Sequence, residues 1–169
     1  GATLALGFDE RIGDNATANV NGILTLSGTE TITTLNINGI GSTLNGTGLL
    51  LAETYNLANG ATIATGANLG SGVLNSDGSA GVTMNGDSAA EDVNVRSGTF
   101  NLNGELTDVT DLTISSGATV NLGGDERVND PATISLLRNA TLNLNGTETV
   151  RSFNSNGTLG LSPTATSGT

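Results

Sequence analysis

Short apolar segments that end at a glycine recur along this chain every 18 to 22 residues. Before most of these glycines, apolar and polar residues alternate, which is the pattern of a strand with one buried face. A repeat of this length is too short for a folded domain and is typical of one turn of a solenoid. A degenerate first copy ends at Phe8, and the later copies end at Gly28, Gly46, Gly66, Gly86, Gly104, Gly124 and Gly146.

Aligning the copies on the glycine indicates three apolar stations in each turn. The first is an alternating pair, as in Leu24 and Leu26, Val82 and Met84, Phe100 and Leu102, Val120 and Leu122, and Leu142 and Leu144. The second lies four residues past the glycine, at Ile12, Ile32, Leu50, Val128 and Val150, with Val109 one residue late. The third is a pair before a turn with Asn or Ser followed by Gly, as in Leu35 and Ile37, Tyr55 and Leu57, Val93 and Val95, and Leu112 and Ile114.

Three short strands per turn, repeated along the chain, predict an all-β fold: a parallel β-helix of about eight turns, in which equivalent stations stack. The general preference for right-handed crossovers makes the coil right-handed. A helical fold is excluded because no window places apolar residues at helical spacing. Two stretches also match position by position, residues 2–14 with 118–130 and residues 26–32 with 144–150, which indicates a duplicated two-turn module.

Composition narrows the function. Residues 1–169 form one uninterrupted array, and we expect a single β-helix segment excised from a longer shaft. Only 2% of residues are aromatic, so the core is expected to consist of aliphatic ladders. The net charge of -11 excludes nucleic acid as a partner, since phosphate binding needs a basic surface. No apolar run approaches the ~20 residues that a membrane-spanning helix needs, so membrane insertion is not expected.

Acidic residues directly after the glycine mark predict a possible metal site. Asp87, Glu105 and Asp125 take this place on what the alignment reads as three consecutive turns, with Asp9 at the same station near the start. Stacked carboxylates repel unless something neutralises them, and calcium suits oxygen ligands at a fixed spacing. The alternative is that these carboxylates face water or pair with Arg127 and Arg11. No other cofactor is required.

Asn and Thr recur at outward strand positions, for instance Asn36, Asn101, Asn121, Asn143, Thr25 and Thr119. Stacked Asn and Thr side chains form hydrogen-bonded ladders in repetitive β structures. The alternative is a polar face for sugar hydroxyls, weak at each turn and strengthened by repetition.

Several phrases resemble the passenger repeats of large secreted bacterial adhesins, the autotransporter and two-partner-secretion exoproteins. They are Leu-Thr-Leu-Ser-Gly-Thr-Glu-Thr-Ile at 24–32, Gly-Ala-Thr-Val-Asn-Leu-Gly-Gly at 117–124 and Thr-Leu-Asn-Leu-Asn-Gly-Thr-Glu-Thr-Val at 141–150. The Asp-Glu-Arg phrases at 9–11 and 125–127 are most similar to exopolysaccharide-binding biofilm-matrix adhesins. The resemblance implies an extracellular shaft segment, at the cell surface or in the matrix, that contacts polysaccharide or other copies of itself.

The alternatives are a β-helical polysaccharide lyase or hydrolase, or a purely carbohydrate-binding module. Such enzymes focus carboxylates and a basic partner on one groove. This chain has no His or Lys, and its acids are spread along the array. We therefore expect no catalytic residues.

Overall fold

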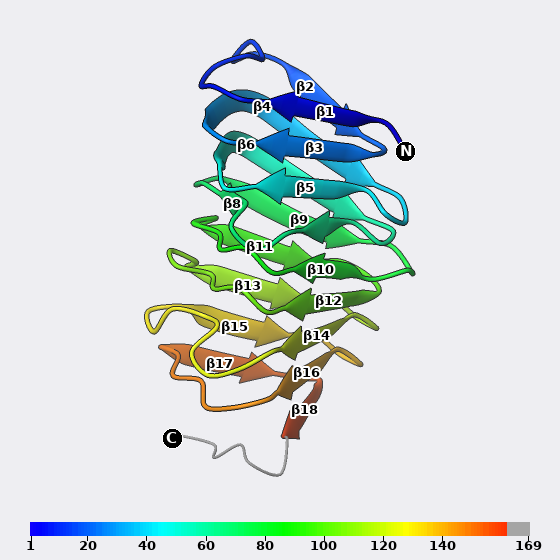
Figure 1. The fold of residues 1–169 in the computed structure, drawn as a ribbon. Helices are drawn as coiled ribbons and strands as arrows, with labels where there is room; N and C mark the ends of the chain where they lie inside the picture. Colours follow the sequence, from blue (N-terminus) through cyan, green and yellow to red (C-terminus); the bar gives the residue numbers. More distant parts are fainter. Residues whose placement is uncertain (162–169) are drawn as a thin grey trace.

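The alternating segments form parallel strands that stack coil above coil, giving a right-handed β-solenoid of about 8 turns (Figure 1). This computed structural model describes residues 1–161, and no helix occurs among them. In Figure 1 the front strands run to the left and the rear strands return to the right as the chain descends, which is the right-handed sense. The predicted fold class is confirmed.

Two parallel sheets form the long faces of the rod. Sheet A is the stack β1-β3-β5-β7-β10-β12-β14-β16-β18, and sheet B is the stack β2-β4-β6-β9-β11-β13-β15-β17, with β8 paired to β6. A third, narrow face consists of β8 and single bridges between successive coils. The strands are β1 Thr3–Leu6, β2 Thr17–Val20, β3 Ile23–Leu26, β4 Thr29–Asn38, β5 Thr43–Gly46, β6 Leu49–Ala58, β7 Thr62–Ile63, β8 Asn68–Leu69, β9 Val73–Asp77, β10 Val82–Met84, β11 Asp92–Val95, β12 Thr99–Leu102, β13 Asp111–Ile114, β14 Thr119–Leu122, β15 Thr133–Leu136, β16 Thr141–Leu144, β17 Ser152–Ser155 and β18 Thr158–Leu161.

The core consists of apolar columns that run along the rod, because strand alternation turns every second side chain inward. The third station is confirmed as one such column on sheet B. Its members, from coil to coil, are Ala18, Leu35, Tyr55, Leu74, Val93, Leu112, Ile134 and Phe153.

The first station is correct in kind but wrong in register near the start of the chain. Leu24 pairs with Leu44, and Leu26 pairs with Gly46, so the marks at Gly28 and Gly46 are not equivalent. Register along sheet A advances by 20, 20, 19, 21, 18, 20, 22 and 17 residues, read from successive partners. The corners absorb these differences, and a count between glycines cannot detect them.

The predicted second station is wrong in part. Leu50 pairs with Glu30 rather than with Ile32, whose partner is Ala52. Further along, the column continues through Leu69, Ser88, Leu106 and Val128, so Leu106 occupies the place predicted for Val109. The sequence pattern failed here because this column contains a charged residue and a serine, both buried.

The recurring glycines have two different physical causes. Gly60 and Gly98 have φ of 91° and 70°, the left-handed conformation that a sharp corner needs and that glycine adopts most readily. Gly86 and Gly104 lie at the corner after sheet A, where a Cβ would overlap the carbonyl oxygen of Ala67 and of Gly86, respectively. The glycine mark therefore lets one coil lie directly against the next.

Candidate functional site: the uncharged face of sheet A

The nine strands of sheet A contain no ionisable residue, although the chain carries 16 acids and five arginines. Their outward side chains are uncharged and mostly Thr or Asn, with the apolar Ala5 and Ile23 near the start of the rod. We call this surface the sheet A face. It comprises Thr3, Ala5, Ile23, Thr25, Thr43, Asn45, Thr62, Thr83, Thr99, Asn101, Thr119, Asn121, Thr141, Asn143, Thr158 and Gly160.

From β12 to β18 the sheet A face becomes regular. One column contains Thr99, Thr119, Thr141 and Thr158, each directly beside the next in register. The adjacent column contains Asn101, Asn121 and Asn143. In this second column each side-chain amide donates to the carbonyl oxygen of the Asn on the preceding coil, at 2.8 Å in both steps. The predicted Asn ladder is thus confirmed.

Sheet B carries a longer ladder of the same kind. Asn19, Asn36, Asn56, Asn75 and Asn94 are linked by Nδ2 to Oδ1 bonds of 2.8, 2.8, 3.0 and 3.5 Å. The outward column beside this ladder is not free of charge, since it includes the directly paired Asp92 and Asp111. The two sheets therefore share the amide ladder but differ in charge.

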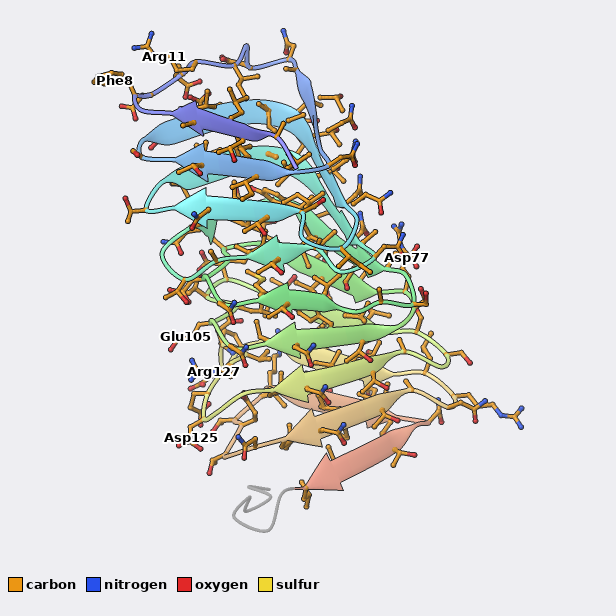
Figure 2. The ribbon with its side chains drawn as sticks, turned by 45° about the vertical axis from the view of Figure 1, so that its right-hand side comes forward. Phe8, Arg11, Asp77, Glu105, Asp125 and Arg127 are labelled. Carbon is orange, nitrogen blue, oxygen red and sulfur yellow. The ribbon has the colours of Figure 1, made fainter. Side chains whose placement is uncertain are left out.

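The acids predicted as a metal site lie at the corner that follows sheet A. Figure 2 shows Glu105, Arg127 and Asp125 along one edge of the rod and Asp77 on the opposite edge. The carboxylates of Asp87 and Asp125 accept the backbone N–H of the next coil, at 2.9 and 2.7 Å. Asp9 does the same at 2.6 Å. These carboxylates stabilise the junctions between coils.

The alignment placed Asp125 directly after Glu105 in one column, and the register corrects this. Leu106 pairs with Val128, so the residue stacked on Glu105 is Arg127, with 3.8 Å between Arg127 Nη1 and Glu105 Oε1. Within residues 1–161 no three acidic side chains come together in a geometry suited to a metal ion. Calcium binding at Asp87, Glu105 and Asp125 stays a prediction.

A buried carboxylate that sequence reasoning missed holds the first two coils together. Glu30 is fully buried, and its two oxygens accept the N–H of Arg11, at 2.8 and 2.9 Å, and that of Ile12, at 2.9 Å. In return, Glu10 accepts from the backbone N–H and the hydroxyl of Thr31. The Asp-Glu-Arg phrase of one coil and the Thr-Glu-Thr phrase of the next thus form one reciprocal set of bonds.

The same set recurs near the other end of the rod. Glu148 accepts the N–H of Arg127 at 2.5 Å and of Val128 at 3.2 Å, and Glu126 accepts from Thr149. The duplicated module was visible in the sequence, and the matched phrases were the available signal. The pairing between them was not visible, because it joins residues about 20 positions apart.

Three side chains have a pKa shifted from its ordinary value by burial or by hydrogen bonds. Burial raises the pKa of Glu148 from 4.5 to about 7, although its bonds from Arg127 and Val128 act in the opposite direction. Bonds from the Ser97 hydroxyl and the Gly78 N–H hold the pKa of Asp77 below its ordinary value. Burial raises the pKa of Tyr55 to about 12, so its hydroxyl stays protonated inside the core.

Comparison with known proteins returns no match to a family model, to a curated protein or to a solved structure. Among the described residues, none belongs to a helix long and apolar enough to cross a bilayer.

Proposed function

We propose that this chain is a structural shaft segment of a secreted bacterial adhesin, located at the cell surface or in a biofilm matrix. In this role the rod sets a distance and offers repeated weak contacts to polysaccharide or to other copies of itself. The observation that carries the proposal is the sheet A face, a continuous row of small polar side chains presented in register on successive coils.

The chemistry of the rod supports contact without turnover. Asp87 and Asp125 serve coil junctions, and within residues 1–161 no three acidic side chains converge on one point. Thr hydroxyls and Asn amides bind sugar hydroxyls by exchange of hydrogen bonds with water, so each contact is worth only about 1 kcal/mol. Many equivalent contacts on one rod convert such weak terms into useful avidity.

The test is a panel of soluble neutral and acidic exopolysaccharides incubated with the purified chain. Retention of a polymer without release of new reducing ends supports a binding shaft, and so does concentration-dependent self-association in sedimentation. Release of product overturns the proposal in favour of a lyase or hydrolase. A chain that stays monomeric and retains no polymer also overturns it.

A further inference from the structure

The repeat and the chemistry of the sheet A face restrict the kind of polymer that it can bind. The inference drawn from them rests on the function proposed above. Neighbouring strands lie ~4.8 Å apart, so equivalent side chains repeat at that interval along the rod axis. The Thr column of β12 to β18 runs unbroken across four strands. A ligand that follows this repeat lies along the rod and crosses the strands.

The hydrogen-bonding groups of this face retain capacity for a ligand. An Asn amide has two N–H donors and two acceptor sites. Within the ladder, Asn121 uses one donor toward Asn101 and one acceptor site toward Asn143, which leaves one of each. Within residues 1–161, the hydroxyls of the four Thr residues in the neighbouring column take part in no side-chain hydrogen bond of the structure. Both columns therefore present paired donors and acceptors, which match the hydroxyl groups of a sugar.

Charge decides among the polymers that carry hydroxyls. The face itself is neutral, in a chain of net charge -11. Arg96 and Arg138 lie at the corner that precedes β12 and β16, and they are outnumbered by the acids Asp87, Glu105 and Asp125 at the corner that follows the sheet A strands. An anionic polymer on sheet A would lie against these carboxylates, and a second copy of the rod would bring its own acidic corner close to them. A neutral polymer avoids both repulsions. With no aromatic side chain on the face, recognition depends on hydrogen bonds rather than on ring stacking.

We infer that the sheet A face from β12 to β18 binds an uncharged, extended polysaccharide laid along the rod axis. The Thr hydroxyls and Asn amides of successive coils contact successive sugars. Binding is weak for a short oligosaccharide and increases with polymer length until the row of coils is covered. It varies little with salt, because no charge pair contributes.

The experiment compares a neutral mannan and a neutral β-glucan with polygalacturonate of matched length, by affinity electrophoresis and calorimetry. Thr119→Asp places a carboxylate in the centre of the Thr column. Thr113→Asp, an outward position of sheet B on the neighbouring strand β13, is the matched control. Circular dichroism and melting establish that both variants keep the fold.

We expect the wild-type chain and Thr113→Asp to bind a neutral polymer with the same affinity, and this affinity to be the same at low and high salt. Thr119→Asp should lose about tenfold or more of the affinity, which is the equivalent of one or more lost hydrogen bonds. An equal loss of affinity in Thr119→Asp and Thr113→Asp would overturn the inference. It would also be overturned if the chain bound only polygalacturonate, or if it associated with itself but bound no polymer. In those last two cases the shaft proposal survives. Absence of any binding or self-association removes both.

Discussion

Removal of the Glu30 carboxylate is predicted to open the first coil and leave the rest of the rod folded. Glu30 is fully buried between coils, and it accepts three short contacts from two backbone N–H groups, those of Arg11 and Ile12. Glu30→Ala leaves both donors without their partner. In a solenoid each coil contacts only its neighbours, so the effect is expected to remain local.

The free-energy cost of Glu30→Ala follows from the two N–H donors that lose their acceptor. A hydrogen bond to a charged acceptor contributes about 1.5 to 3 kcal/mol. The desolvation cost of the buried carboxylate offsets part of this sum, and the exposed position of Arg11 lets water replace part of the rest. We expect a net loss of about 2 to 3 kcal/mol for the first coil, which corresponds to a decrease of about 30- to 150-fold in amide protection.

Hydrogen exchange measured by mass spectrometry or NMR checks this prediction. Protection should decrease at Arg11, at Ile12 and along β1 and β2, with β11 to β16 unchanged. Glu53→Ala is the matched control, since Glu53 is exposed on β6 and its carboxylate accepts no hydrogen bond within the described residues. Unchanged protection at Arg11 and Ile12 in Glu30→Ala would refute the role of the carboxylate. An equal loss along the whole rod would refute its local character.

Other predictions concern pH, packing, the amide ladder and calcium. The pKa of Glu148 is raised from 4.5 to about 7 in the folded state, so its contribution to stability is complete below about pH 4.5 and is lost as pH rises through 7; the urea midpoint should fall over this window, and less steeply in Glu148→Gln. Phe100→Ala empties a fully buried site and should cost about 3 to 5 kcal/mol in urea unfolding, whereas Phe153→Ala, at a side chain 40% exposed, should cost much less. Asn56→Asp replaces a ladder donor with a carboxylate that faces the amide oxygen of Asn36 on the preceding coil, and should cost about 1 to 3 kcal/mol by the same assay. Calcium at millimolar concentration should raise the melting temperature if the three predicted metal ligands bind it, and an unchanged temperature with calcium and with chelator would remove that site.

The sequence predicts the coil and its third station well, because both depend on local signals. Alternation defines each strand, and the Gly at 39, 60, 98 or 117 marks the corner that follows. The register of the first station could not be predicted from local signals. Gly46 looks like the end of a strand, but its partner is Leu26, and only the pairing between coils determines that register.

The predicted second station and the predicted stacking of Asp125 on Glu105 were wrong for a related physical reason. Glu30 lies between two threonines and reads as an outward residue, yet it turns inward because the coil above it presents two free N–H groups. Asp125 was aligned with Glu105 by its distance from a glycine. A longer corner between them shifts the register and puts Arg127 there instead. Buried polar contacts between coils depend on such shifts, and the sequence pattern does not record them.

The outward columns of sheet A are uncharged, and the stacking of coils accounts for only one of them. Stacked amides bond to one another and stacked carboxylates repel, so an outward ladder of Asn is favoured on either sheet. This reason covers the Asn columns of both sheets but not the columns beside them. On sheet B the neighbouring column accepts Asp92 next to Asp111, which indicates that the coil tolerates charge at such a place. On sheet A the corresponding places are Thr99, Thr119 and Thr141. Charge at these positions is therefore not excluded by the coil itself, and their neutrality is the feature that the proposed uncharged ligand accounts for.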